Sequence, residues 1–379
     1  MNPADPIALA AALIRCPSVT PADAGAQAVL ADALAGLGFA VTRLRFGEID
    51  NLHARIGDGA PHFAFAGHTD VVPPGGGGHA ASAWSSDPFA AEMRDGKLYG
   101  RGAVDMKGGI AAFVAACADH LAKAPRHGSI SLLITGDEEG VAKDGTAPLM
   151  AWLAERGEVQ DFCLVGEPTC RERLGDVVKI GRRGSISAAI TVFGTQGHVA
   201  YPARADNPAH RLVRALAALI AAPLDAGSAH FEPSSLQITS IDIGNPAGNV
   251  IPAEARARLN IRFNDHHSGA SLDAWLRATL AQHAERSVIE TAISGEAFLT
   301  EPGPAVARLA AAIAAECGIT PALETGGGTS DARFISRYCP VAEFGLVGDT
   351  MHQVDERVPV ADLWRLKAIY GRILADFLA

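Results

Sequence analysis

The first half of the chain alternates short apolar runs with longer segments of helical pattern. The apolar runs are "HFAFAG", "SISLLITG" and "DFCLVGEP", and the helical segment "GGIAAFVAACADHLAKA" lies between the first two. At the N-terminus, "IALAAALI" predicts a further helix. Strands that alternate with helices form a largely parallel sheet with helices on both faces. The Gly-rich stretch 75–83 is expected to be a surface loop, because several glycines in a row do not hold one conformation cheaply.

The pattern changes at about residue 184. The next segments are "SISAAITVFG" (strand), "NPAHRLVRALAALIAA" (helix), "SLQITSIDIG" and "EARARLNIRF" (paired strands), "SGASLDAWLRATLAQHAE" (helix) and "SVIETAI" (strand). The order β-α-β-β-α-β is the split pattern of a ferredoxin-like α+β domain. Helix, strand and a terminal helix follow it. We therefore predict an α/β domain made of residues 1–182 and 296–379, interrupted by an inserted domain at 183–295.

Length, charge and cysteine usage narrow the class of protein. A chain of 379 residues exceeds the size, roughly 250–300 residues, at which a single core stops growing, so two domains are expected. The net charge of −10 argues against a nucleic-acid partner. Six scattered cysteines without a C-x-x-C pair predict reduced thiols and a cytosolic protein. The N-terminal segment carries Asp5 where a signal peptide would be basic, so we expect neither secretion nor a membrane span.

A histidine and an aspartate end the apolar run in "FAGHTDVVPPG". Positions i and i+2 of a strand point to the same face, so His68 and Asp70 are expected to leave one face at the strand's end. Ligand sites of open α/β sheets lie at such ends. The alternative is a histidine that an aspartate merely holds in place.

Five further stretches place acids or histidines at the ends of apolar segments. They are "GRGAVDMKGG" (Asp105), "LLITGDEEG" (Glu138, Glu139), "CLVGEPT" (Glu167), "FGTQGHVAYP" (His198) and "DTMHQVDE" (His352). Each could be a solvated loop charge. Together, histidines and carboxylates at one sheet edge suit zinc, which binds both at ~2.0–2.2 Å.

A pair of zinc ions sharing one carboxylate would be electrically neutral here. The four positive charges are balanced by Asp105, Glu139, Glu167 and one hydroxide, and neutrality matters because buried uncompensated charge is costly. Two metals ~3.5–4 Å apart are an arrangement for metal-assisted hydrolysis. If Glu139 is a ligand, Glu138 is free to act as the general base. Asp70 is then expected to accept the second ring N–H of His68 with its carboxylate.

These motifs also carry a family resemblance. The set "GHTDVVPPG", "GRGAVDMKGG", "GDEEG", "GEPT", "GHVAYP" and "TGGGTSDARF" resembles the co-catalytic zinc aminoacylase and carboxypeptidase family over nearly the whole chain, in matching order and spacing. The resemblance implies a zinc-hydrolase catalytic domain with an inserted dimerisation or lid domain. It also implies a homodimer, and two Zn2+ ions per subunit with Co2+ as a substitute.

The resemblance implies a role for each matching residue. His68, Glu167 and bridging Asp105 would hold one zinc, and His352, Glu139 and Asp105 the other. Glu138 would be the general acid and base, and a cis peptide bond would follow Asp105. The implied substrate and oxyanion residues are Arg182, His198, Tyr201, Asn249, Arg262, Gly328 and Thr329. We expect His198 to act in the site of the partner subunit; the alternative is that it only caps a turn.

The acyl group decides between related activities. Arg182, Arg262 and the "GGGTS" stretch favour a succinyl group, whose free carboxylate needs cations or N–H donors, although each arginine could instead form a surface or interdomain ion pair. The alternatives are a sister enzyme such as acetylornithine deacetylase and a catalytically inactive binding protein. In one departure from the family pattern, Asp355 stands where asparagine is usual, which could alter the orientation of His352. The other departure is the high glycine content of the loop 75–83.

Overall fold

The computed structural model describes residues 2–75, 83–123 and 127–379 in two compact units. Unit 1 comprises Met1–Ile180, Thr300–Glu324 and Ser330–Ala379, and unit 2 comprises Gly181–Leu299 and Thr325–Thr329. The predicted insertion 183–295 lies within unit 2. The predicted Gly-rich loop lies largely outside the described residues, which omit 76–82.

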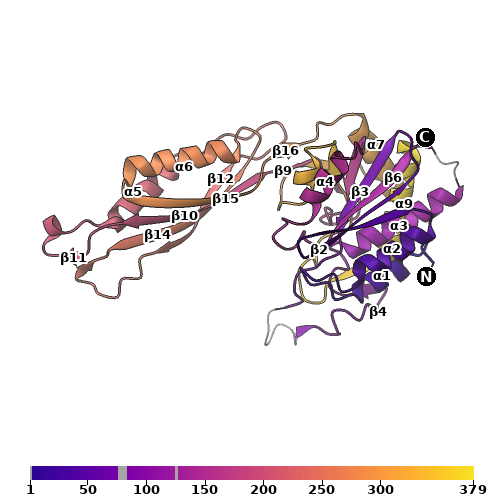
Figure 1. The fold of residues 1–379 in the computed structure, drawn as a ribbon, viewed down its shortest axis with the longest axis horizontal. Coiled ribbons are helices and arrows are strands. Elements are labelled where there is room, and N and C mark those ends of the chain that lie inside the picture. The colour runs from indigo at the N-terminus through magenta and orange to yellow at the C-terminus, as the bar shows by residue number, and fades with distance from the viewer. Residues whose placement is uncertain (1, 76–82, 124–126) are drawn as a thin grey trace. The chain divides into compact units, whose positions relative to one another are not determined.

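Unit 1 is built on an eight-stranded sheet (Figure 1). Its strands, in spatial order, are β1 (Ala40–Phe46), β2 (Ile49–Ile56), β6 (Ser129–Thr135), β3 (His62–His68), β7 (Phe162–Val165), β18 (Val341–Glu343), β8 (Val177–Lys179) and β17 (Ala322–Glu324). The central pairs β6–β3, β3–β7 and β7–β18 are parallel, whereas β1–β2 and β2–β6 are antiparallel. The predicted α/β class with a mostly parallel central sheet is confirmed.

Helices and a small sheet complete unit 1. The helices are α1 (Pro6–Ile14), α2 (Ala26–Gly36), α3 (Lys107–Lys123), α4 (Thr146–Ala154), α7 (Pro304–Cys317), α8 (Ala332–Ile335) and α9 (Val360–Phe377). The small sheet has the strands β4 (Glu92–Arg94), β5 (Lys97–Tyr99) and β19 (Arg357–Pro359). Within the described ranges, no helix combines the length and the apolar character that a membrane crossing requires.

Aromatic side chains join the sheet of unit 1 to α3 and α9. Phe63 and Phe65 lie two residues apart on β3 and therefore point to the same face, and both contact the ring of Phe113 on α3. Tyr370 on α9 packs edge-on against Phe65 and Phe113, and its hydroxyl donates to the main-chain oxygen of Phe344. This packing fixes β3 and the start of α3, the two elements that flank the site described below.

Unit 2 has the predicted order of strands and helices. Its main elements are β10 (Gly184–Phe193), α5 (Pro208–Leu219), β12 (Ser235–Asp242), β14 (Glu254–Phe263), α6 (Gly269–His283) and β15 (Ser287–Gly295). Short elements join them: β9 (Gly181–Arg182), β11 (Gly197–His198), the 3-10 turn Pro202–Arg204, β13 (Val250–Ile251) and β16 (Phe298–Leu299). The sheet order β12-β14-β10-β15, antiparallel throughout, is that of a ferredoxin-like domain.

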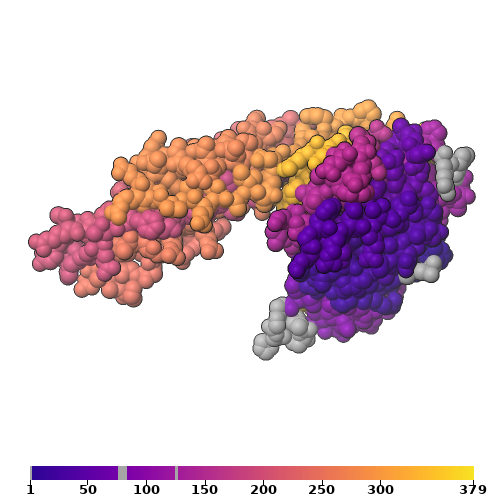
Figure 2. All heavy atoms as spheres, in the orientation of Figure 1, coloured from indigo at the N-terminus to yellow at the C-terminus, as the bar shows by residue number. Residues whose placement is uncertain are grey.

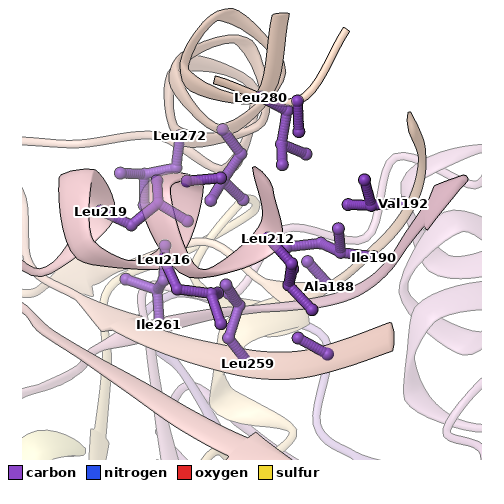
Figure 3. Packing of buried hydrophobic residues seen from close by; sticks show 14 of the residues in the cluster. Ala188, Ile190, Val192, Leu212, Leu216, Leu219, Leu259, Ile261, Leu272 and Leu280 are labelled. Atoms are coloured by element: carbon purple, nitrogen blue, oxygen red, sulfur yellow. The ribbon is translucent and has the colours of Figure 1, made fainter. Parts of the chain in front are cut away.

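One face of the unit 2 sheet forms the core with both helices (Figure 3). Alternate residues of β10, such as Ala188 and Ile190, point toward α5 and α6 because side chains of a strand alternate between faces. The helices begin where the sequence provides caps: Asn207 accepts the N–H of Ala209, and Ser268 forms a capping box with Ser271.

Candidate active site

The parallel strands of unit 1 bring the predicted ligands to one edge of the sheet. β3 ends at His68, β6 is followed by Glu138 and Glu139, and β7 is followed by Glu167. Because β3 pairs in parallel with both β6 and β7, the carboxyl ends of these three strands lie side by side. Asp105 joins them from the turn that precedes α3, and a cis peptide bond links it to Met106, as the resemblance implies.

Two groups of three side chains share Asp105. In the first group, Nε2 of His68 lies 3.0 Å from Oδ1 of Asp105 and 3.8 Å from Oε1 of Glu167. In the second, Nε2 of His352 lies 3.1 Å from Oδ2 of Asp105 and 2.8 Å from Oε1 of Glu139. Each group could hold one metal ion, with the two oxygens of Asp105 facing different groups.

The chemistry of the donor atoms fits bound cations. Nδ1 of His68 lies 2.9 Å from the main-chain oxygen of Asp70, so the ring donates there and Nε2 of the neutral ring carries a lone pair. That lone pair faces the Asp105 carboxylate, which is also an acceptor. A cation between the two atoms satisfies both. Imidazole nitrogen with carboxylate oxygen is a donor set that zinc accepts.

Without a cation, the ionisation of these groups is strongly perturbed. Burial alone would lower the pKa of His68, but hydrogen bonding to Asp105 and the nearby carboxylates raise it well above its ordinary value. Hydrogen bonding to Asp105 and Glu139 raises the pKa of His352 to about 10. Burial, followed by the charge of Asp105, raises the pKa of Glu167 well above its ordinary value. The raised pKa values show that these groups favour their protonated forms, so the cluster of carboxylates favours added positive charge at this place. A bound cation would supply that charge.

The predicted contact of the Asp70 carboxylate with His68 stays a prediction. The nearer carboxylate oxygen lies 3.6 Å from Nδ1 of His68, and the main-chain oxygen of Asp70 lies closer, at 2.9 Å. The carboxylate turns toward the loop after β6, where it accepts the main-chain N–H groups of Glu138 at 3.3 Å and Glu139 at 3.0 Å. Asp70 therefore holds the loop that carries both glutamates.

Glu138 is the remaining carboxylate of this edge. Burial raises its pKa to about 8, and the charges of Asp331 and Glu139 add to the shift while His68 opposes it. Asp331 is a buried residue that the sequence reasoning missed, although the quoted stretch "TGGGTSDARF" contains it. One of its oxygens accepts the Thr146 hydroxyl at 2.6 Å, and its other oxygen has no partner in the described part of the chain.

Asp355, the departure from the family pattern, lies in the loop that presents His352. Both residues have left-handed backbone, with φ values of +61° at His352 and +57° at Asp355. Asparagine and aspartate are both enriched in this region relative to other residues, so aspartate is compatible with the backbone. Its carboxylate accepts the main-chain N–H and the hydroxyl of Ser85.

The predicted substrate residues all belong to unit 2: Arg182, His198, Tyr201, Asn249, Arg262, Gly328 and Thr329. Arg182 on β9 donates to the main-chain oxygen of Gly328 at 3.0 Å. Arg262 on β14 has a lowered pKa, first through burial and then through the charge of Arg183.

A second set of these residues gathers around β11. The ring centroids of His198 and Tyr201 are 5.7 Å apart, and the main-chain oxygen of Asn249 accepts the N–H of Val199. Within unit 2, β11 and β9 lie at opposite ends (Figure 1), and the region of β11 forms an exposed tip of the unit (Figure 2). Unit 2 thus carries Arg182 and His198 at two separate places.

Fold and site together describe a hydrolase of the metallopeptidase type, and comparison with known proteins agrees. A model of the peptidase family M20/M25/M40 matches residues 64–376, so the chain belongs to this family and is a hydrolase. The chain is 65% identical over 375 residues to the succinyl-diaminopimelate desuccinylase of Acidiphilium cryptum, with 99% of each chain covered. The family expected from the motifs is confirmed.

Solved structures show the same fold at low identity. An aminopeptidase from Bacillus cereus matches with a TM-score of 0.79 and 19% identity, covering 100% of each chain. The YXEP protein of Bacillus subtilis matches with a TM-score of 0.71 and 13% identity, covering 98% of this chain and 97% of its own; it is described as a dinuclear metal-binding peptidase of the M20 family. At these identities the likeness establishes the fold.

Proposed function

We propose that the chain hydrolyses N-succinyl-LL-2,6-diaminopimelate to succinate and LL-2,6-diaminopimelate, a cytoplasmic step in the synthesis of lysine and diaminopimelate. The observation that carries the proposal is the 65% identity, over 99% of both chains, to a relative named for this activity. The two groups of potential metal ligands sharing Asp105 support it independently, because they fit amide hydrolysis.

The metal ligands in this proposal are His68, Asp105 and Glu167 at one site and Asp105, Glu139 and His352 at the other. Zn2+ ions held there, with Co2+ as a substitute, would polarise the scissile carbonyl and lower the pKa of the attacking water. Asp105 would serve both sites, since its two oxygens face different histidines.

Glu138 is the proposed general acid and base. Its carboxylate accepts a proton from the attacking water and returns it to the nitrogen of the leaving amine. Asp70 orients Glu138 by accepting its main-chain N–H, so that the carboxylate meets the water in one position. A site of this kind gains from such fixed geometry because the reacting atoms must be aligned before reaction.

The succinyl carboxylate is proposed to bind through unit 2. Arg182 and Arg262 supply positive charge, and Gly328 and Thr329 line the position beside Arg182, whose guanidinium already contacts Gly328. Charge-assisted hydrogen bonds from arginine are the strongest partners available for a carboxylate. Tyr201 and Asn249 are proposed as further substrate contacts beside His198.

His198 is proposed to act in the partner's site of a homodimer, where its ring N–H stabilises the oxyanion. Its separation from Arg182 within unit 2 supports this, because one copy of the unit holds the two residues at opposite ends (Figure 1). Its exposure at the tip leaves the ring accessible to another chain.

A subunit-mixing experiment tests the role of His198. One variant carries Glu138→Gln and the other His198→Ala, and each alone is expected to be inactive. If His198 acts across the dimer, exchange of subunits creates one complete site per mixed dimer and activity returns. No recovery despite exchange proven by mass spectrometry would show that His198 acts within its own chain.

The test of the proposed function is turnover of two substrates by the zinc-loaded protein. Release of succinate from N-succinyl-LL-2,6-diaminopimelate should be much faster than release of acetate from N-acetylornithine. Faster turnover of the acetyl substrate would replace the proposal by the deacetylase alternative. Absence of turnover with either compound, in a folded protein that binds zinc, would favour a non-catalytic role.

A further inference from the structure

Arg101 and Glu356 form a buried ion pair next to the candidate metal ligands. Their side chains are 3% and 0% exposed, and Nη1 of Arg101 lies 2.7 Å from Oε2 of Glu356. The pair lies within unit 1, and neither residue belongs to the proposed ligands. Taking two charges out of water is costly, so a buried pair is poor evidence for a stabilising role alone.

Glu356 holds the segment that ends in Asp105. Its Oε1 accepts the main-chain N–H groups of Val104 at 2.9 Å and Asp105 at 3.2 Å, and its Oε2 accepts that of Gly102 at 3.1 Å. With the bond from Arg101, the carboxylate has four donors and its acceptor capacity is filled. The main chain of the shared ligand Asp105 is therefore tied to Glu356.

Arg101 holds the segment that begins at His352. Its Nη1 donates to the main-chain oxygen of Gln353 at 3.3 Å, and its Nη2 donates to those of His352 and Pro73, each at 3.4 Å. The guanidinium also lies over the ring of Trp84, 5.3 Å from its centroid. One planar side chain thus bonds to the backbone of two segments, one at Pro73 and one at His352 and Gln353.

The segment that Arg101 holds has left-handed backbone at His352, whose φ value is +61°. Left-handed backbone at a residue other than glycine costs free energy and persists where surrounding contacts determine it. The bonds from Arg101 to His352 and Gln353 are contacts of this kind.

We infer that the Arg101–Glu356 pair is a positioning device for the two metal sites, in which Glu356 sets the place of Asp105 and Arg101 sets the place of His352. This inference rests on the two cation sites of the proposed function. It assigns different consequences to the two residues. Loss of the Arg101 contacts to His352 and Gln353 affects the site that contains His352 more than the other, whereas loss of the Glu356 contacts affects both sites alike, because both use Asp105.

The test is titration of the metal-free protein with Zn2+, followed by calorimetry, and with Co2+, followed by visible absorption. Arg101→Lys keeps a positive charge opposite Glu356 but removes the planar guanidinium group that bonds to several main-chain oxygens at once. We expect the affinity of the His352 site to fall roughly 10–100-fold, the range for groups that orient metal ligands, with little change at the His68 site. In Glu356→Gln both affinities should fall. His352→Ala, which removes one ligand, identifies the signal of its site.

Arg55→Lys is the matched control. Arg55 pairs with Glu158 at 3.2 Å in unit 1, and its other side-chain bond among the described residues goes to Ser129 at the start of β6, the end of the strand away from Glu138 and Glu139. Both metal affinities should therefore stay as in the wild type. If Arg101→Lys does not fold, as judged by circular dichroism, the double variant Arg101→Gln with Glu356→Gln is titrated instead. It leaves no unpaired buried charge, and the affinities of both sites should fall because the Glu356 carboxylate is also lost; unchanged affinities in this variant would overturn the inference.

The outcomes separate this inference from the proposed function. Suppose that the wild-type protein binds two cations. Unchanged affinities in Arg101→Lys, or an equal fall of the affinity at both sites, would then overturn the inference about the pair and leave the proposed function intact. Wild-type protein that binds fewer than two cations removes the two sites on which the inference rests, and the inference about the pair is then wrong, while turnover of the succinyl substrate decides the proposed function separately.

Discussion

Replacing Asp70 by asparagine separates two ways in which this residue could support the site. The carboxylate accepts the main-chain N–H groups of Glu138 and Glu139, while the partner of the His68 ring is the main-chain oxygen of Asp70. An asparagine side chain has the same shape but only one acceptor oxygen, and its NH2 group would face an N–H donor. The main-chain oxygen that serves His68 is unchanged by the substitution.

The size of the effect follows from these contacts. One hydrogen bond to a charged acceptor is lost at Asp70, and such bonds contribute about 1.5–3 kcal/mol. If that loss appears in the transition state through a displaced Glu138, kcat falls by a factor of about 10 to 150. The affinity of the site that contains His68 should stay within about threefold of the wild type, since groups that orient a ligating histidine are worth roughly 10–100-fold and this one is retained.

The assay combines steady-state kinetics on the succinyl substrate with zinc titration of the metal-free Asp70→Asn variant. Asp176→Asn is the control: its carboxylate also accepts main-chain N–H groups, those of Arg171, Glu172 and Arg173, but these serve no candidate ligand. The control should lose stability and keep its kcat. A large loss of zinc affinity at the His68 site in Asp70→Asn, with kcat of the loaded protein unchanged, would refute the reasoning.

Three further predictions concern other parts of unit 1. Glu138→Gln should bind two zinc ions yet lose most of its activity, because the amide fills the same space but accepts no proton; loss of zinc instead would mean that Glu138 is a ligand. Burial, and then the charge of Arg55, lowers the pKa of His62 below 6.5, so the unfolded chain binds more protons than the folded one. The contribution of His62 to the free energy of unfolding should therefore be fully present above pH ~6.5 and be lost as the pH drops below it. His62→Gln should reduce this loss in urea titrations. An unchanged pH dependence in the variant contradicts the assignment. In Gly345→Ala the new Cβ would lie 2.5 Å from the main-chain oxygen of Glu167. The variant should therefore lose about 1–3 kcal/mol of stability, seen as a lower melting temperature, and bind zinc more weakly. A normal melting temperature with normal zinc affinity would show that the backbone can move.

The sequence predicted the parts of the site that depend on strand direction. His68, Glu139 and Glu167 each follow an apolar run, and parallel strands bring such positions to one edge regardless of side-chain detail. The order of strands and helices in unit 2 could also be predicted, because strands show alternating apolar residues and helices show apolar residues at helical spacing. The short strands β4, β5 and β19 were not predicted, since three-residue segments carry no usable period.

Contacts between distant segments could not be predicted in this way. The carboxylate of Asp70 binds a loop 68 residues further along the chain, and Asp331 receives its hydroxyl bond from a residue 185 positions away. Arg101 and Glu356 are 255 positions apart. Periodicity describes a residue's own element and says nothing about which distant loop meets it. These pairings are decided by packing, and only the three-dimensional structure contains them.

The division of the chain sets the order in which its parts can be completed during synthesis. The core of unit 2 is made of residues between Ile186 and Ala284, one continuous stretch. The central sheet of unit 1 lacks β18, the parallel neighbour of β7, until residues 341–343 have been made, and α9 follows later still. Domains commonly finish from the N-terminus onward as they leave the ribosome. Here unit 2, although it begins later in the chain than unit 1, can complete its core first. Meanwhile the edge of β7 that will pair with β18 remains unpaired, and a chaperone or another nascent chain could bind there.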